Sequence, residues 1–230
     1  MTNKLNAKES YNRKGLYNGY DKNNKEREAL DYYSTPTEEV TNILKTLNID
    51  FSGDTILEPS AGGGHMSAAI LDYLNSRDWS GIPLLISTDI QKRELCRDDL
   101  VIAAGKEYDF LSDNYPHVNN IDWIVMNPPY SLIEPFVMRS LGIANKGVIM
   151  LGRLQFLEGQ SRYNNILKDF PPDEVYVYVD RIGCYKNGDV NQNVANAQAY
   201  AWFVWRTKAP HLDGPRIKWI RRADKIKGLK

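Results

Sequence analysis

The chain has 230 residues, 42% hydrophobic and 25% charged, which suits one large globular α/β domain or two small ones. Lysine plus arginine and aspartate plus glutamate each number 29, so the chain as a whole lacks the charge of a general nucleic-acid binder. No apolar run approaches the roughly 18 residues that a membrane span requires. Two cysteines and three scattered histidines predict a cytoplasmic protein with neither a disulfide framework nor a metal site.

The hydrophobic pattern predicts alternating helices and strands from residue 35 onward. The first helix is expected over 35–47, with Thr35 or Thr37 as its N-cap. Further helices are expected over 65–76, part of 97–105, 132–144 with an interruption at Pro135, and 162–170. Strands are expected over 54–58, 83–90, 121–127, 147–153, 174–182 and 199–207, with a weaker strand or turn over 106–112.

This alternation predicts an α/β fold, with a Rossmann-like mixed sheet of about seven strands and helices on both faces. The last two strands, separated by a polar loop over 183–198, are expected to form a hairpin that closes one sheet edge. The chain ends are more basic than the middle. Residues 1–30 hold seven lysines and arginines against four acids, and residues 216–230 hold seven against one. Such ends are solvated and partly flexible, or they contact phosphate.

A glycine-rich turn follows the first predicted strand of the sheet, in LEPSAGGGHM at 57–66. Three glycines between a strand and a helix allow backbone amides to approach a ligand closely. The stretch lacks the GxGxxG and GxxxxGK[ST] patterns of dinucleotide and nucleoside triphosphate sites. Glu58 would repel a pyrophosphate and suits a ligand with an ammonium group. The alternative is a turn that serves only tight packing.

Two later strand ends each carry an acid. Asp89, in STDI, is placed to accept hydrogen bonds from ribose hydroxyls, or it is a plain turn or capping residue. In YDFL, Asp109 can accept a hydrogen bond from an adenine amino group while Phe110 covers the ring. Taken alone this second pair is a weak signal, because such pairs are common in turns.

The strand in IDWIVMNPPY (121–130) stops at the tetrad Asn127, Pro128, Pro129 and Tyr130. Two prolines remove two backbone donors and fix two φ angles, so neither strand nor helix continues through them. An amine conjugated with an aromatic ring becomes a usable nucleophile when acceptors hold its hydrogens. The Asn127 side-chain oxygen and the Pro128 carbonyl are two such acceptors, and Tyr130 offers a face for the ring. The tetrad predicts an in-line displacement that depends on positioning.

The glycine turn in ILEPSAGGG and the tetrad in VMNPPY together resemble the amino-group methyltransferases that use S-adenosylmethionine, particularly the DNA adenine-N6 methyltransferases. YYSTP at 32–36 is similar to that family's [FY]-x-T-P element. The resemblance spans roughly residues 32–206. It implies a class I methyltransferase domain over 31–210, between a polar, partly flexible arm (1–30) and a basic tail (211–230).

The resemblance also implies roles for individual residues. The catalytic residues would be Asn127, Pro128, Pro129 and Tyr130, holding an adenine that has left its stack. The residues that would bind S-adenosylmethionine are Tyr33, Thr35, Pro36, Glu58, Ser60, Ala61, Gly62, Asp89, Ile90, Asp109, Phe110 and Asn127.

On the substrate side, Tyr185 is the candidate for an aromatic on the far face of the flipped base, with Phe156 as its rival. Tyr185 is otherwise a solvent-exposed loop tyrosine. Arg153, Arg162 and Arg181 follow strand ends, where they contact phosphate beside the base or form surface salt bridges.

Few residues of the chain remain for the recognition of a defined DNA site. Family members of this kind usually have a sizeable recognition domain, whereas only the loop over 183–198 and the basic C-terminus remain here. A homodimer or a specificity partner is therefore an open expectation, as is the bacteriophage setting typical of such compact members. Alternative substrates are an RNA adenine or a protein glutamine amide, and a non-catalytic methyltransferase-like module is a third possibility.

Overall fold

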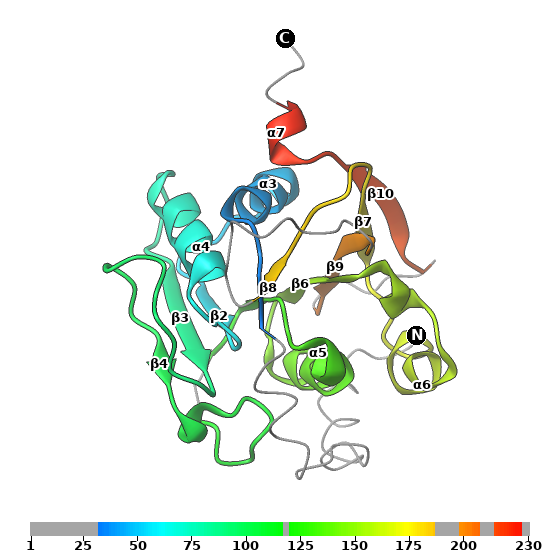
Figure 1. Cartoon of the computed structure of the whole chain (residues 1–230), viewed down its shortest axis with the longest axis horizontal. Helices are drawn as coiled ribbons and strands as arrows, with labels where there is room; N and C mark the ends of the chain where they lie inside the picture. Colours follow the sequence, from blue (N-terminus) through cyan, green and yellow to red (C-terminus); the bar gives the residue numbers. More distant parts are fainter. Residues whose placement is uncertain (1–31, 117–119, 187–197, 208–213, 227–230) are drawn as a thin grey trace.

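The computed structural model describes residues 32–116, 120–186, 198–207 and 214–226, and its centre is an eight-stranded mixed sheet (Figure 1). The strand order is β10-β7-β9-β6-β5-β2-β3-β4, and β9 alone runs antiparallel to its neighbours. The strands are β2 (Thr55–Glu58), β3 (Leu84–Asp89), β4 (Ala103–Ala104), β5 (Trp123–Met126), β6 (Gly147–Arg153), β7 (Glu174–Tyr178), β9 (Tyr200–Arg206) and β10 (Arg216–Ile220).

Helices cover both faces of this sheet, as Figure 1 shows. One face carries α3 (Thr37–Leu47) and α4 (His65–Asn75), and the other carries α5 (Ile133–Ile143) and α6 (Gln160–Arg162), which continues into a π-helical turn over Tyr163–Leu167. A short helix, α7 (Ala223–Ile226), follows β10. Among the described residues, no helix has both the length and the apolar character to cross a bilayer.

The central strands are buried because both of their faces are covered. All four residues of β5 are buried, as are the first six of β6, so these strands are continuous apolar runs rather than alternating ones. The core beneath α5 includes Phe136, Met150 and Phe203, and the core beneath α3 and α4 includes Ile43 and Trp202. The sheet thus holds the carboxyl ends of β2, β3 and β5 in a rigid frame.

A separate two-stranded ladder lies next to the carboxyl end of β5. Strand β1 (Tyr33–Ser34) pairs antiparallel with β8 (Tyr185–Lys186), so Ser34 lies opposite Tyr185. This pairing joins segments about 150 residues apart in the chain.

Most predicted elements are present, but three details of the sequence-based prediction are wrong. The N-cap of α3 is Pro36, and neither Thr35 nor Thr37 caps the helix. Pro135 does not interrupt α5, because it lies in the first turn, where its missing N–H would have no intrahelical partner. Residues 97–105 contain no helix but hold the short edge strand β4, and the expected strand or turn after it is a 3₁₀ turn at Lys106–Tyr108.

The sheet edge beyond β7 also differs from the prediction. Strands β7 and β9 are antiparallel partners as expected, but β9 inserts between β6 and β7 and is therefore internal. The edge is formed by β10, which pairs parallel with β7 and lies within the expected basic tail. Ile220 from this strand is buried in the core beside α3, which is why a tail segment becomes part of the fold.

Candidate active site

A cavity of about 310 Å³ opens where β2, β3 and β5 end at the same edge of the sheet. In an α/β sheet this is the general position for a ligand. The predicted site residues that line the cavity are Tyr33, Thr35, Glu58, Ser60, Ala61, Asp89, Ile90, Asp109, Phe110, Asn127, Pro128, Pro129 and Tyr130. Residues far apart in the sequence therefore meet in one pocket.

The amide of Asn127 is held in a single orientation. Its Nδ2 donates to the Tyr33 carbonyl oxygen and to Thr35 Oγ1, each at 3.0 Å. The Tyr33 carbonyl can only accept, so nitrogen must be the atom that faces it. The other amide atom, Oδ1, is buried and has no hydrogen-bond partner among the described residues. A buried acceptor without a partner is uncommon, and here it lies at the wall of a cavity.

Tyr130 is clamped on its hydroxyl and on its ring. The hydroxyl donates to the Tyr200 hydroxyl at 2.9 Å, and the Arg153 guanidinium lies over the ring, with its carbon 4.0 Å from the ring centroid. The Tyr33 ring is 5.3 Å away, tilted by 36°. Burial, with Cys184 and Tyr200 nearby, raises the pKa of the Tyr130 hydroxyl well above its usual value. Burial also raises the pKa of Tyr200 to about 12, so both hydroxyls stay neutral at physiological pH.

The glycine turn connects β3 with the segment that precedes α3. Gly62 has a φ of +55°, and its N–H donates to Asp89 Oδ2 at 2.8 Å. Tyr32 lies directly on this turn, because a Cβ added to Gly62 would stand 2.1 Å from the Tyr32 ring. The Gly63 N–H donates to the Tyr32 hydroxyl at 3.0 Å. Only glycine fits at position 62 under that ring.

Asp89 presents its carboxylate at the end of β3 with both oxygens anchored. Oδ2 accepts from the Gly62 N–H and Oδ1 from the Gln91 N–H, each at 2.8 Å. Each carboxylate oxygen retains acceptor capacity, so the group can still bind two ligand hydroxyls. Burial raises the pKa of Asp89 above its ordinary value, although the two backbone donors and Arg93 oppose this.

Glu58 is the most deeply buried acid of the cavity, with 2% of its surface exposed. Burial is the main cause that raises its pKa to about 8; the hydrogen bond from the Ser67 hydroxyl opposes this rise, and the neighbouring Asp89 contributes to it. The Glu58 carboxyl is therefore largely protonated at pH 7 when no cation is beside it. A cationic ligand in the cavity would favour the ionised form.

The far end of the cavity combines an anchored acid with an aromatic wall. Asp109 Oδ1 accepts from the Leu111 N–H at 3.0 Å. Phe110 is buried against the rings of Tyr115 and Phe136, with centroids 5.4 and 5.0 Å away. A flat apolar ligand group fits such a wall.

Several predicted contacts lie elsewhere. Pro36 does not line the cavity because it caps α3, and Gly62 does not because Tyr32 covers it. The prediction that Phe156 contacts a base is wrong, since this residue is 2% exposed and packs in the core against Phe203, 5.0 Å away. Arg162 donates to the carbonyls of residues 155 and 158, so it holds its own turn together.

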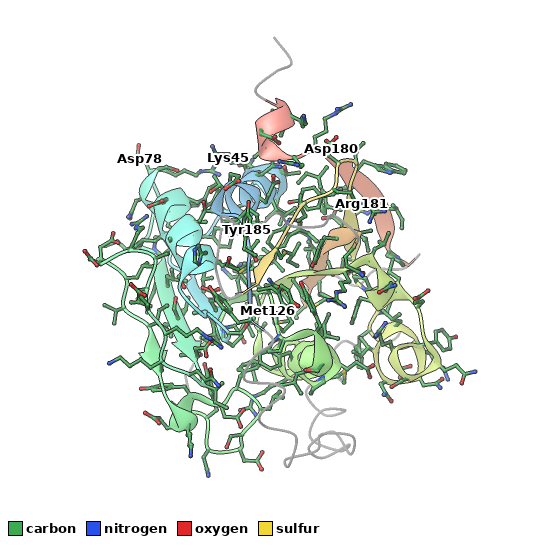
Figure 2. The ribbon with its side chains drawn as sticks, viewed as in Figure 1. Lys45, Asp78, Met126, Asp180, Arg181 and Tyr185 are labelled. Atoms are coloured by element: carbon green, nitrogen blue, oxygen red, sulfur yellow. The ribbon has the colours of Figure 1, made fainter. Side chains whose placement is uncertain are left out.

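The remaining two substrate candidates differ in their position. Tyr185 is half-buried in β8 next to Ser34 and does not line the cavity, and Figure 2 shows it towards the middle of the molecule. Arg181 is exposed and lies beside one end of β10, away from Met126, the residue before Asn127 (Figure 2).

Sequence reasoning missed other residues of the cavity wall. Among them are Tyr32, His65, Arg93, Lys106 and Phe136. The Arg93 guanidinium lies over the Tyr32 ring at 4.7 Å, and the Tyr32 hydroxyl lies 3.2 Å from His65 Nδ1. The only signal for Tyr32 was its position beside the YSTP segment, because the glycines it covers follow 30 residues later.

The structure is similar to several solved methyltransferase structures. A putative class I S-adenosylmethionine-dependent methyltransferase from Listeria monocytogenes matches with a TM-score of 0.59 and 9% identity, over 96% of this chain and 74% of the other. The methyltransferase subunit of a type I restriction-modification system from Streptococcus thermophilus matches with a TM-score of 0.56 and 13% identity, over 83% of this chain. A putative RNA methyltransferase from Pyrococcus horikoshii matches with a TM-score of 0.53 and 16% identity, over 89% of this chain and 98% of the other.

The chain spans about half the length of the restriction-modification subunit, because the match covers 47% of that protein. No protein-family model and no curated protein sequence matches the chain. At these low identities the likeness concerns the fold, which is the Rossmann-like fold of class I methyltransferases. The mixed sheet with helices on both faces confirms the predicted fold class.

Proposed function

We propose that this chain transfers a methyl group from S-adenosylmethionine to the exocyclic amino group of adenine in DNA. The observation that carries the proposal is the Asn127 amide, whose nitrogen is fully engaged by Tyr33 and Thr35 while its buried Oδ1 lacks a partner. An acceptor with this geometry is suited to a donor brought by a substrate.

The cavity residues fit S-adenosylmethionine by their chemistry. Asp89 would accept hydrogen bonds from the ribose hydroxyls, and Phe110 with Ile90 would cover the adenine on an apolar wall. Glu58 would ionise beside the positively charged methionine end. When bound, the cofactor supplies a methyl group on a sulfonium, an electrophile with a good leaving group.

The tetrad prepares the nitrogen that receives this methyl group. The lone pair of an adenine amino group is delocalised into the ring, so the nitrogen is planar and weakly nucleophilic. Asn127 Oδ1 and the Pro128 carbonyl would accept its two hydrogens and favour a pyramidal nitrogen. The Ser60 hydroxyl, which donates to the Asn127 carbonyl oxygen at 3.4 Å, joins the tetrad to the cofactor side. Positioning of this kind supplies much of the rate enhancement in such a displacement.

DNA is the proposed carrier of the adenine because the glycine turn and the tetrad occur together as in the DNA adenine methyltransferases. The likeness to a restriction-modification methyltransferase subunit agrees with that choice at the level of the fold. A second copy or a separate specificity protein is the proposed source of further DNA contacts. We expect the protein to act in the cytoplasm, of a bacterium or of a phage-infected cell.

Transfer of a labelled methyl group tests the proposal. The purified chain is incubated with labelled S-adenosylmethionine and with unmethylated duplex DNA, single-stranded DNA, RNA or a glutamine-containing release-factor peptide. Label on adenine N6 of DNA is the expected result, and Asn127→Ala is the inactive control. Label in the peptide or only in RNA contradicts the DNA assignment, and label in no substrate, with the cofactor still bound, contradicts methyl transfer itself.

A further inference from the structure

The outer edge of the sheet carries an exposed tryptophan within a basic segment of the chain. Trp219 of β10 is 72% exposed and Ile217, two residues earlier, is 47% exposed. Alternation places these two side chains on one face of the strand, opposite Lys218 and the buried Ile220. Exposed apolar side chains that lie together and are rimmed by polar residues are typical of an interaction site.

The charge of this edge is strongly positive. Residues 214–226 hold five lysines and arginines against one aspartate, and that aspartate, Asp224, pairs with Arg222. Beneath the strand, the Glu174 carboxylate is shared by three cations: Lys218 at 2.7 Å, Arg206 at 3.4 Å and Arg216 at 3.8 Å. Glu39, from α3, accepts a hydrogen bond from the α7 backbone. These acids neutralise only part of the charge.

We propose that β10 and α7 bind a single strand of nucleic acid beside the target nucleotide, with one unpaired base stacked on Trp219. The target nucleotide itself rests on the proposed function. An exposed aromatic face among cations is the combination by which proteins hold unpaired strands, since the ring stacks on a base while lysine and arginine contact phosphate. The duplex interior offers no free base face, so stacking of this kind selects for unpaired nucleic acid.

The position of the edge is compatible with a strand that enters the cavity. Because β10, β7, β6 and β5 are mutually parallel, the carboxyl end of β10 lies at the same end of the sheet as Asn127. Four strand spacings separate β5 from β10, which corresponds to about 19 Å. A stacked strand covers that distance in on the order of six nucleotides. Arg181, whose carbonyl accepts from Arg222 at 3.3 Å, lies beside the end of β10 (Figure 2).

A second copy of this chain fits the β10 edge less well than a nucleic acid does. Antiparallel pairing of two β10 edges centred on Lys218 would place the two Lys218 side chains opposite each other. It would also bring the five cations of each copy together. Like charges opposite one another destabilise a strand pair. A polyanion, in contrast, is attracted by all of these charges.

Tryptophan fluorescence tests the proposal without any catalytic activity. Trp219 is the exposed member of the five tryptophans of the chain, since Trp79 is half-buried and Trp123, Trp202 and Trp205 are buried. Titration with a single-stranded oligonucleotide of about 16 nucleotides should quench the emission, and the matched duplex should quench it much less. Trp219→Ala should abolish the quenching and weaken single-strand binding, measured by anisotropy, roughly 5- to 100-fold.

Matched controls separate stacking from general surface changes. Val101→Ala and Ile82→Ala each shorten an apolar side chain that is about as exposed, 89% and 93%, on other parts of the surface, and should leave binding unchanged. Arg221→Ala should lower the slope of log affinity against log salt by about 0.7, as loss of one phosphate contact on a single strand requires.

The outcomes distinguish this inference from the proposed function. Quenching without methyl transfer to any nucleic acid supports the inference and removes the proposed function. Methyl transfer to DNA with unchanged affinity in Trp219→Ala overturns the inference alone. Equal quenching by duplex and single strand overturns the assignment to unpaired nucleic acid. A concentration-dependent dimer that Trp219→Ala dissociates, without quenching by nucleic acid, shows that a second copy is the occupant.

Discussion

The proposed cofactor half and the proposed substrate half of the cavity are stabilised in different ways. On the cofactor side, Asp89 and Asp109 each accept an N–H from a residue two positions further along the chain. On the substrate side, Asn127 is held by Tyr33 and Thr35, and Tyr130 by Tyr200, over separations of 70 to 94 residues. The first half combines these local turns with a longer-range contact, from the Gly62 N–H to Asp89. The second depends on the assembled tertiary structure, so its mutations should affect transfer more than cofactor binding.

Asn127→Ala should have the largest effect. Removal of the unpartnered Oδ1 should lower the rate of methyl transfer by about 10²- to 10³-fold, the loss typical when one preorganised polar group is deleted. Cofactor affinity, measured by calorimetry, should change by less than about threefold. Asn165→Ala, which truncates a half-buried asparagine bonded to Glu134 outside the cavity, is the matched control. A large loss of cofactor affinity would place Asn127 mainly on the cofactor side.

Asp89→Asn should show the opposite pattern. The neutral amide accepts fewer hydrogen bonds than the carboxylate, so cofactor affinity should fall about 10- to 100-fold, as expected for loss of one to two charge-assisted hydrogen bonds. The transfer rate at saturating cofactor should be retained. Asp99→Asn, which alters an exposed carboxylate paired with Arg97, provides the control. A reduced rate with unchanged affinity would contradict the separation of the two halves.

Glu58 should make cofactor binding depend on pH. Its pKa is about 8 in the free protein, and a cation beside it would lower that pKa, so the affinity should rise about tenfold between pH 6 and 8 with proton release. The stability of the free protein should change with pH in the opposite direction. The folded state holds the proton more tightly than the unfolded chain, so stability contributed by the neutral carboxyl is complete below about pH 4.5 and is lost as pH rises towards 8.

Glu58→Gln tests whether Glu58 causes the pH dependence of both cofactor affinity and stability. The variant should bind the cofactor with an affinity that no longer rises with pH, and its melting temperature should fall less between pH 5 and 8. Calorimetry in buffers with different ionisation enthalpies measures the proton released. Unchanged pH dependence in Glu58→Gln would assign the proton to another group.

Tyr200→Phe should have the smallest effect. It removes the hydroxyl that accepts from Tyr130 and leaves the ring in place, so the KM for DNA should rise about three- to tenfold, as for loss of one neutral hydrogen bond. Cofactor affinity should not change. Tyr73→Phe removes a buried hydroxyl that accepts from Arg77 outside the cavity and should leave KM unchanged. Equal effects of both variants would indicate general destabilisation.

The sequence predicted the strands around the cavity. Strands β2, β3, β5 and β6 were predicted from short apolar runs, and Glu58, Asp89 and Phe110, which the sequence singled out, line the cavity. Their role in cofactor binding stays a prediction. These features depend on periodicity, glycine φ angles and proline geometry within a few residues, which the sequence displays directly.

The other features of the site and the sheet depend on the tertiary structure. Which atom of Asn127 remains free depends on Tyr33 and Thr35, and the clamp on Tyr130 depends on Arg153 and Tyr200, which face each other across β6 and β9. The place of β10 at the sheet edge and the burial of Phe156 in the core were likewise missed. In each case segments more than 20 residues apart make the contact, and the hydrophobic pattern of one segment does not identify its partner.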